Sequence, residues 1–363
     1  MEKTVRVDLA ERSYDVRVGV GLIQRLGEAA AEVQDVSTAA VVSDSRVAEL
    51  YAASAVESLH EAGLTTALID FPAGEANKTL QTVARVLDEL FAISPAIDRD
   101  SLIVALGGGV TGDLAGFVAA TALRGLRWLQ CPTTLLSAVD ASVGGKTGVD
   151  HPAGKNLIGA FHQPRGVLID VSTLKTLDDR ELHSGLAECV KHAVIADGEM
   201  LEFLEDNVEA ILSRQAEVMT DLIARNVRIK ASFVSADERE AGRRAHLNFG
   251  HTIGHAIEAF VGFGNITHGE AVSLGMVAAC RLAVHRELIE DEAAARVADI
   301  LVRMGLPVRW SGLDSDKVWQ IMLHDKKVRG GQVRMVLPVV LGEAAIFSDI
   351  TADTIRSAVE SLL

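Results

Sequence analysis

Two histidines on one predicted helix are the clearest sign of chemistry in this sequence. His251 and His255 are four residues apart in the segment Asn-Phe-Gly-His-Thr-Ile-Gly-His, so both side chains face the same side of a helix. Imidazoles at this spacing are typical metal ligands. The helical motif of zinc proteases has Glu directly after the first His, but Thr252 occupies that position here. The pair therefore indicates a metal site without indicating peptide hydrolysis.

Two further side chains could complete a metal site. His268 precedes another predicted helix in the segment Thr-His-Gly-Glu-Ala, and Glu188 lies in Gly-Leu-Ala-Glu-Cys-Val-Lys-His. One carboxylate and two imidazoles would hold a divalent ion and leave coordination positions open for a substrate. The alternative for any single histidine is a hydrogen-bonded position in the core.

A glycine-rich loop is the second candidate site. Residues 102–106 run directly into Gly-Gly-Gly-Val-Thr-Gly-Asp, in which Gly107, Gly109 and Gly112 fit the pattern GxGxxG between a strand and a helix. Such a loop lets backbone N–H groups approach a pyrophosphate. The motif follows about the third predicted strand, not the first, and residues 130–134 lack the acidic residue usual about 20 positions later. We predict phosphate or dinucleotide binding, with a tight packing turn as the alternative.

The few lysines of the chain lie mostly in glycine-rich or motif-like segments. Ten of the 35 basic residues are lysines, and the other 25 are arginines. Compact ammonium groups beside glycines are suited to contacting anions, and surface scatter is the alternative explanation. The lysines concerned are Lys78, Lys146, Lys155, Lys191, Lys230, Lys326 and Lys327.

The order of the predicted elements gives an α/β domain that would position these loops. Alternating apolar residues over 5–9 and 14–18 predict an opening β-hairpin. Alternating strands and helices then imply a parallel sheet covered by helices, a Rossmann-like nucleotide-binding domain over residues 1–176. The strands are predicted over 39–43, 66–71, 101–106, 127–130 and 167–170, and the helices over 46–62, 79–91 and 113–123.

Beyond residue 176 the pattern becomes mostly helical, with one late strand pair over 333–341. We expect a second, mostly α-helical domain over 177–363 that carries the metal and substrate groups. Its helices are predicted over 199–212, 217–234, 250–260, 270–285, 291–304 and 351–362.

Composition narrows the class of protein. The 363 residues include 35 basic and 50 acidic side chains, a formal net charge of −15, which argues against broad binding to nucleic acid or an anionic membrane. The cysteines, Cys131, Cys189 and Cys280, form no CxxC pair. Neither a signal segment nor a membrane span is indicated. We expect a soluble cytoplasmic protein.

Several ordered motifs extend these signals over most of the chain. One reads Asp-Ala-Ser-Val-Gly-Gly-Lys-Thr-Gly over residues 140–148, and another reads Arg-Ala-His-Leu-Asn-Phe-Gly-His over 244–251. In length and order the motifs resemble the 3-dehydroquinate synthases, a family of sugar-phosphate cyclases. The matching segments are 72–79, 106–148, 151–164, 184–191, 244–251, 268–271 and 325–328.

The resemblance implies a homodimeric cytoplasmic lyase of the shikimate pathway, which leads to aromatic amino acids. Its substrate would be a phosphorylated keto-sugar acid, 3-deoxy-D-arabino-heptulosonate 7-phosphate, and its products 3-dehydroquinate and phosphate. NAD and a divalent ion, usually zinc or cobalt, would be the cofactors. Transient oxidation at C5 would acidify the C6 proton and permit β-elimination of phosphate, and reduction and an aldol cyclisation would follow.

The resemblance also implies roles for particular residues. The metal ligands would be Glu188, His251 and His268, with His255 facing the substrate instead. The NAD contacts would be Glu75, Lys78, Gly108, Gly109, Val110, Thr111, Gly112, Asp113, Thr133, Thr134, Asp140, Lys146, Lys155, Thr173, Leu174, Lys175 and Thr176. The substrate and catalytic groups would be Lys146, Asn156, Lys191, Lys230, Arg244, Asn248, His255 and Lys326 or Lys327, while Arg124 would reach the neighbouring subunit's site.

Three other functions compete with this interpretation. A polyol dehydrogenase of the glycerol dehydrogenase type would need the sheet domain and the metal but not the cluster of basic residues, and it would accumulate NADH. A sister cyclase, such as an aminodehydroquinate, valiolone-type or deoxy-inosose synthase, would share most motifs. A non-catalytic binding protein is disfavoured by the complete set of ligand-type residues.

Overall fold

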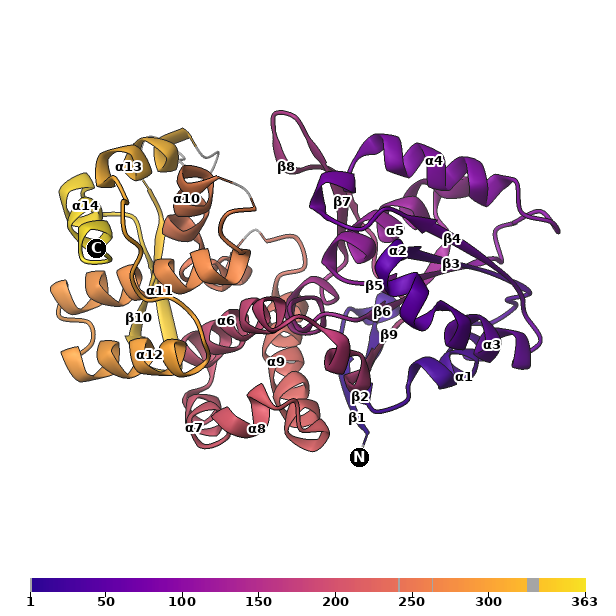
Figure 1. Ribbon diagram of the computed structural model, residues 1–363, viewed down its shortest axis with the longest axis horizontal. Coiled ribbons are helices and arrows are strands. Elements are labelled where there is room, and N and C mark those ends of the chain that lie inside the picture. The colour runs from indigo at the N-terminus through magenta and orange to yellow at the C-terminus, as the bar shows by residue number, and fades with distance from the viewer. Residues whose placement is uncertain (1, 241, 263, 325–332) are drawn as a thin grey trace. The chain divides into compact units, whose positions relative to one another are not determined.

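The chain forms two compact units in the computed structural model (Figure 1), which describes all residues except 1, 241, 263 and 325–332. The first unit comprises residues 1–177 and 216–239. The second unit comprises residues 178–215 and 240–363.

A seven-stranded sheet is the centre of the first unit, with the order β1-β2-β9-β6-β5-β3-β4. Only the neighbours β1 and β2 are antiparallel, so the predicted opening hairpin and parallel sheet are both confirmed. The strands are β1 (Lys3–Val7), β2 (Tyr14–Gly19), β3 (Thr38–Asp44), β4 (Thr65–Phe71), β5 (Leu102–Gly107), β6 (Arg127–Pro132) and β9 (Gly166–Asp170).

Helices cover both faces of this sheet, which explains why its central strands are apolar on both sides. Every residue of β5 is buried. One core packs α1 (Leu26–Ala31) and α3 (Ala53–Glu61) against one face, and the other packs α4 (Leu80–Phe91) and α5 (Gly109–Thr121) against the opposite face (Figure 1). The helix predicted over 46–62 comprises α2 (Ser45–Val47), a π-helical turn (Ala48–Ala52) and α3.

A β-hairpin that the sequence did not predict follows β6. Strands β7 (Lys146–His151) and β8 (Gly154–Phe161) pair antiparallel, and Gly148 lies opposite Gly159. A Cβ atom at Gly148 would be 2.3 Å from the carbonyl oxygen of Ile158, so the pairing leaves no room for a side chain there. The hairpin carries Lys146, Lys155 and Asn156, which are among the predicted site residues.

Helix α9 (Ala216–Ala236) belongs to the first unit, although the sequence placed it in a second domain that began at residue 177. It packs against β1 and β2, the edge of the sheet. Just beyond it, the Glu238 carboxylate accepts hydrogen bonds from Arg12 at 2.5 and 2.8 Å and from Gln163 at 2.9 Å. The expected domain boundary between residues 176 and 177 therefore differs from the observed division by this helix. Hydrophobic periodicity predicts a helix but does not reveal which part of the molecule it packs against.

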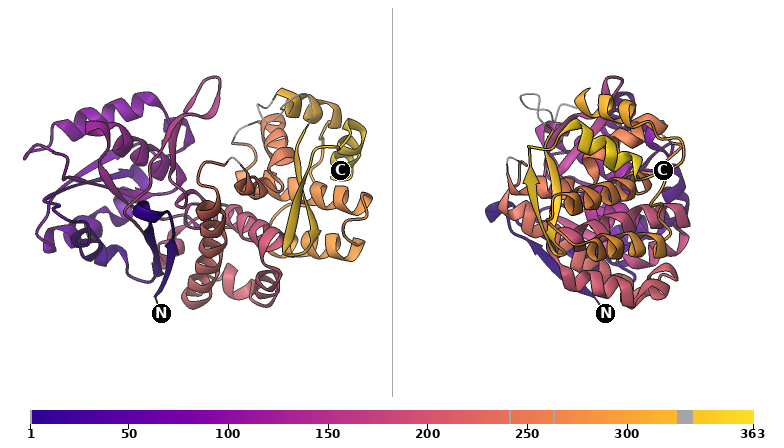
Figure 2. Two further views of the ribbon diagram at one scale, coloured as in Figure 1. Left: turned by 180° about the vertical axis from the view of Figure 1, so that it is seen from behind. Right: turned by 90° about the vertical axis from the view of Figure 1, so that its left-hand side faces the viewer.

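The second unit is mostly helical, as predicted, with one antiparallel strand pair. The helix expected over 199–212 is broken at Asn207 into two, and neither α6 nor α13 was predicted. Its elements are α6 (Asp179–Ala196), α7 (Gly198–Asp206), α8 (Val208–Leu212), α10 (His251–Val261), α11 (His268–His285), α12 (Asp291–Arg303), α13 (Ser315–His324), β10 (Met335–Val340), β11 (Glu343–Phe347) and α14 (Ala352–Glu360). Figure 2 shows β10 and β11 running beside the helices of this unit.

No helix among the described residues combines the length and the apolar composition that crossing a bilayer requires.

Candidate active site

Three helices of the second unit meet closely because glycines occupy their contact points. A Cβ atom at Gly275 of α11 would lie 1.9 Å from the carbonyl oxygen of Gly250, which precedes α10. A Cβ atom at Gly269, near the start of α11, would lie 2.3 Å from the carbonyl oxygen of Ser184 in α6. Gly250 also has a φ of 76°, a left-handed conformation that favours glycine. Side chains from α6, α10 and α11 can therefore reach one another.

The start of α11 is fixed by a capping box. The Glu270 N–H donates to the Thr267 hydroxyl at 3.2 Å, and the Thr267 N–H donates to the Glu270 carboxylate at 2.7 Å. Arg180 of α6 donates two hydrogen bonds to the same carboxylate, at 3.1 and 2.8 Å. His268 is the first residue of this helix, so its position relative to α6 is well defined.

Glu188, His251 and His268 form a compact cluster of one carboxylate and two imidazoles. Glu188 Oε1 lies 3.1 Å from His268 Nε2 and 3.4 Å from His251 Nε2. All three candidate ligand atoms lie within 4.8 Å of one another. The Glu188 side chain is fully buried, whereas the His268 side chain keeps 30% of its exposure. The cluster therefore combines a buried carboxylate with an imidazole that solvent can reach.

The charges in this cluster suit metal binding. Burial alone would raise the pKa of Glu188, but the Lys191 ammonium, paired with its second oxygen, and the two imidazoles hold that pKa well below its usual range. Burial also lowers the pKa of His251 well below its usual range. Near pH 7 the carboxylate is thus ionised and this imidazole is neutral, which are the states that metal ligands require.

The spacing of these atoms fits a tetrahedral ion. Two ligand atoms, each about 2.0–2.1 Å from such an ion, are about 3.3 Å apart, and the observed N–O distances are 3.1 and 3.4 Å. His251 Nδ1 lies 3.0 Å from the Phe249 carbonyl oxygen, which directs Nε2 toward Glu188. The donor set, two nitrogens and one carboxylate, is typical of zinc and cobalt sites.

His255 lies beside the cluster. Its ring centroid is 5.2 Å from that of His251 and 6.0 Å from that of His268. Among the described residues, the atoms grouped with His251 Nε2 are those of Glu188 and His268. The helical spacing of His251 and His255 therefore identified one member of the cluster and one neighbour.

The helical segment Arg243–Asn248 leads into α10 and carries two more predicted site residues. Arg244 is buried. The Asn248 amide donates to the Ala245 carbonyl oxygen and to the Glu240 carboxylate, both at 3.2 Å. These polar groups thus precede His251 on the same stretch of chain, whereas Lys326 and Lys327 lie outside the described residues.

In the first unit, the glycine loop lies where β5 ends and α5 begins. Gly108 is the N-cap, and α5 starts at Gly109, four residues before the predicted start. A Cβ atom at Gly107 would be 2.4 Å from the Thr111 hydroxyl, and one at Gly112 would be 2.2 Å from Gln130 Nε2. The loop thus needs glycine, and its first-turn N–H groups lie at the carboxyl edge of the sheet, where α/β proteins bind nucleotides.

An aspartate that the sequence analysis did not single out secures this loop. Asp44 ends β3, the strand next to β5, and its carboxylate accepts a hydrogen bond of 3.0 Å from the Thr111 hydroxyl. The signal was present, because Asp44 follows a buried strand whose carboxyl end meets the same sheet edge.

Lys78 brings together residues that the sequence assigned to cofactor and substrate. Its buried ammonium donates to Asp113 Oδ2 and to Asn156 Oδ1, each at 2.6 Å. Burial alone would lower the pKa of Lys78, but the Asp113 carboxylate raises it above its usual value. Asn156 has a φ of 54°, and its N–H donates to Asp150 at 2.7 Å. Asp150, which the sequence analysis did not single out, therefore holds Asn156 in place.

Lys230 lies in the first unit with Asp140. The buried Lys230 ammonium donates to Asp140 Oδ1 at 2.6 Å and also to the Asp140 carbonyl oxygen. Asp140 belongs to a π-helical turn, Ser137–Ala141, that follows β6. This pair links α9 to the segment that follows the carboxyl end of β6.

The remaining predicted residues occupy varied positions. Glu75, Lys146, Lys155 and Lys175 are exposed, while Thr133 and Thr173 are buried. Arg124 is exposed and has a φ of 68°, next to Leu123 at 49°. Val110 lies in the first turn of α5, Leu174 and Thr176 lie in the 3-10 helix Val171–Thr176, and Thr134 follows β6.

The first unit combines a parallel sheet with a glycine loop of the phosphate-binding type, and the second combines helices with a carboxylate–imidazole cluster. This combination is typical of two-domain proteins that bind a nucleotide cofactor and a metal ion. The chain belongs to the 3-dehydroquinate synthase family. Residues 68–184 match the family described as 3-dehydroquinate synthase N-terminal, and residues 185–328 match the one described as 3-dehydroquinate synthase C-terminal.

Individual relatives agree with this assignment. The chain is 45% identical over 348 residues to a 3-dehydroquinate synthase of Desulforamulus reducens, covering 96% of each chain. It is 46% identical over 359 residues to that of Symbiobacterium thermophilum, covering 98% of this chain and 99% of the relative.

Solved structures of sister cyclases share the fold. The 2-epi-5-epi-valiolone synthase of Streptomyces hygroscopicus, with NAD+ and Zn2+ bound, is 31% identical with a TM-score of 0.88 and 98% coverage of both chains. A 2-deoxy-scyllo-inosose synthase, complexed with carbaglucose-6-phosphate, NAD+ and Co2+, is 28% identical with a TM-score of 0.89, covering 99% of this chain and 100% of its own. A glycerol dehydrogenase of Schizosaccharomyces pombe, 19% identical with a TM-score of 0.68, covers 95% of this chain and 87% of its own and shares the fold alone.

Proposed function

We propose that this protein is a 3-dehydroquinate synthase of the shikimate pathway, a lyase that converts 3-deoxy-D-arabino-heptulosonate 7-phosphate to 3-dehydroquinate and phosphate. The observation that carries the proposal is the Glu188–His251–His268 cluster in a chain that matches this family from residue 68 to residue 328. NAD+ with Zn2+ or Co2+, as bound in the related cyclases, are the cofactors proposed here.

The proposal assigns the cofactors to the two candidate sites. Glu188, His251 and His268 would hold the ion, and the loop over 107–113 with Lys78 would hold NAD. When bound, NAD supplies a hydride acceptor that later returns the hydride, and the ion supplies a Lewis acid for the alcohol oxygen that is oxidised. Lys191 keeps the Glu188 carboxylate ionised through their ion pair.

The basic residues would neutralise the substrate's phosphate and carboxylate groups. Ammonium and guanidinium groups stabilise a departing phosphate and hold a flexible chain in one geometry. In a protein with a net charge of −15, such groups must act locally. The charged groups proposed for this role are Lys146, Lys230, Arg244 and Lys326 or Lys327, and Asn156, Asn248 and His255 would add hydrogen bonds to the substrate.

Turnover with defined products tests the function. Purified protein is incubated with the heptulosonate phosphate, NAD and zinc, and both phosphate and NADH are measured. We expect phosphate release without net NADH, abolished in Lys146→Ala and unchanged in Lys317→Ala, which alters an exposed lysine of α13. NADH accumulation with a polyol would instead indicate a dehydrogenase. Phosphate release only from a sugar phosphate that lacks the carboxylate would indicate a sister cyclase.

The same proposal includes a cytoplasmic homodimer in which Arg124 reaches the neighbouring subunit's site. Cys131 and Cys280 are buried thiols, and burial raises the pKa of each to about 12. Thiols that are buried and so weakly acidic support a reducing compartment. The exposed, left-handed Arg124 turn supports a role for this residue outside its own sheet edge.

A further inference from the structure

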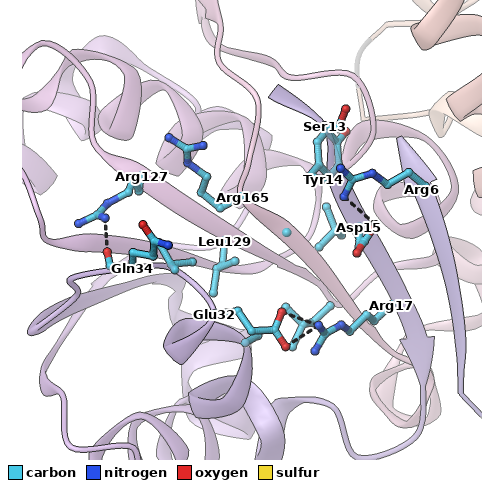
Figure 3. Close-up of a pocket in the computed structure, with 15 residues that line it drawn as sticks. Arg6, Ser13, Tyr14, Asp15, Arg17, Glu32, Gln34, Arg127, Leu129 and Arg165 are labelled. Atoms are coloured by element: carbon cyan, nitrogen blue, oxygen red, sulfur yellow. Dashed lines mark hydrogen bonds and ion pairs between the residues drawn. The ribbon is translucent and has the colours of Figure 1, made fainter. Parts of the chain in front are cut away.

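A cavity of about 430 Å³ opens in the first unit at the amino ends of β2, β6 and β9 (Figure 3). The glycine loop follows the carboxyl end of β5, so the cavity and the loop lie at opposite edges of the sheet. Strand β6 runs between these edges from Arg127 to Pro132, a span of about 16 Å. The cavity is thus separate from the residues proposed to hold NAD.

A glycine creates the floor of this cavity. In the sheet register Gly166 lies between Asp15 of β2 and Leu129 of β6. Gly166 is one of the lining residues, and a Cβ atom there would make a tight contact of 3.3 Å with Leu129 Cδ2 and crowd this part of the cavity. The other apolar residues that line the hollow are Ala29, Val33, Val167 and Leu168. The floor is therefore suited to an apolar group.

Four arginines surround this floor, against two carboxylates among the lining residues. Arg6 donates to Asp15 at 3.1 Å, and Arg17 donates to Glu32 at 2.6 Å (Figure 3). Each of these two ion pairs is neutral overall. The other two arginines of the lining are Arg127, the first residue of β6, and Arg165, which directly precedes β9.

Arg127 and Arg165 retain binding capacity toward an anion. Arg127 donates to the Asp100 carbonyl oxygen at 2.6 Å and to the Gln34 carbonyl oxygen, and it forms an ion pair of 3.2 Å with the Asp100 carboxylate, whose side chain is 63% exposed. Its Nε is buried and has no hydrogen-bond partner. Arg165 is exposed, and within the described part of the chain its guanidinium forms no ion pair (Figure 3).

We propose that this cavity, hereafter the arginine cavity, binds a small organic oxyanion: a phosphate or carboxylate carried on a compact apolar body. The guanidinium groups would bind the oxyanion, and the hollow at Gly166 would hold the apolar body. Because Arg127 pairs with Asp100, the uncompensated positive charge at the cavity is that of Arg165, and the chain as a whole has a net charge of −15.

Calorimetric titration of the holoenzyme at low ionic strength tests the proposal. Phenyl phosphate combines both required features, inorganic phosphate tests the oxyanion alone, and benzyl alcohol tests the apolar body alone. Arg165→Glu reverses the charge at the rim without breaking an ion pair among the described residues. Arg99→Glu is the matched control, because it alters an exposed arginine of the same unit outside the cavity.

We expect phenyl phosphate to bind wild type at least about fivefold more tightly than either partial probe, and about tenfold more weakly to Arg165→Glu. Arg99→Glu should bind as wild type does, and both variants should keep wild-type turnover. Equal affinity of wild type and Arg165→Glu, equal weakening in both variants, or no binding to wild type would each overturn the proposal. So would inorganic phosphate binding as tightly as phenyl phosphate.

Discussion

Glu188 is a carboxylate removed entirely from solvent, and such a group stays ionised only if positive charge lies close to it. Lys191 provides a permanent charge at one oxygen. The other oxygen lies 3.4 Å from His251 Nε2 and 3.1 Å from His268 Nε2, and burial lowers the pKa of His251 well below its usual range. A divalent ion at this position would add positive charge beside the carboxylate, so we expect metal retention to depend on Glu188, His251 and His268.

His251→Ala should therefore lose the ion. Removing one of three protein ligands should lower zinc affinity by about 100-fold or more, and turnover should be lost with it. Metal content after dialysis, measured by mass spectrometry, checks this expectation. His255→Ala is the matched control, because it removes a neighbouring imidazole from the same helix face and should leave the zinc content intact. Full metal occupancy in His251→Ala would contradict the ligand assignment.

Prediction at the scale of residues succeeded where a motif encoded a local geometry. The loop over 107–113 was located correctly because glycines between a strand and a helix constrain the backbone directly. The spacing of His251 and His255 was less informative. It shows that both side chains lie on one face of a helix, but it does not show which residues of other helices lie opposite them. Glu188 and His268 were candidate ligands from their residue types and motifs, the family resemblance favoured them over His255, and the geometry brings both next to His251.

At the scale of elements, glycine contacts determine how closely α10 and α11 approach. Gly275→Ala would place a methyl group 1.9 Å from the Gly250 carbonyl oxygen, so the helices must separate. We expect a cost of about 1–3 kcal/mol and a lower melting temperature, together with a lower zinc content. Gly19→Ala in β2 is the control, since its new Cβ would meet only ordinary contacts at 3.4 Å or more. Equal melting temperatures for both variants would refute the prediction.

The end of α9 is held by charge. The hydrogen bonds from Arg12 are the main reason why the pKa of Glu238 is lowered. A carboxyl with a lower pKa in the folded state than in the unfolded state stabilises the fold above its unfolded pKa of about 4.5, and this contribution disappears as the pH falls through the folded value.

Glu238→Gln should therefore lower the free energy of unfolding by about 1 kcal/mol at pH 7, and the difference from wild type should shrink steadily below pH of about 4. Denaturant unfolding of both proteins across this pH range measures it. Glu217→Gln, which alters an exposed glutamate near the start of α9, should show no such trend. A difference that does not change with pH would show that the ion pair with Arg12 is not its source.

Helices and strands were predicted well where the apolar residues follow a simple pattern along the chain, and they were missed where no such pattern is present. The strands over 38–44 and 102–107 are apolar runs between turns, and the structure confirms them within one or two residues. Helix α6 buries residues around most of its circumference, so it lacks the polar face that makes a helix visible in a sequence. The hairpin β7–β8 is rich in glycine and largely exposed on β8, so it shows no alternation of apolar residues.

At the scale of the whole molecule, the proposed dimer can be tested by exchanging subunits. Arg124→Ala and Lys146→Ala should each be inactive alone. If Arg124 serves the neighbouring site, random mixing of dissociated subunits should restore about a quarter of wild-type activity, since about half the dimers would be hybrids with one intact site. Turnover of the mixture, with each variant alone as the control, measures this. No recovery after confirmed exchange would place Arg124 in its own subunit's function.

The path of the chain through the two units has a consequence for synthesis. The polypeptide leaves the first unit after Leu177, returns for residues 216–239, and then departs again. During translation the sheet could not be covered by α9 until about 60 further residues had left the ribosome. The ion pair between Asp140 and Lys230 of α9 could not form before then either. A gene cut at the apparent domain boundary would encode a sheet whose β1–β2 edge lacks its covering helix, so a sound amino-terminal fragment must include that later segment.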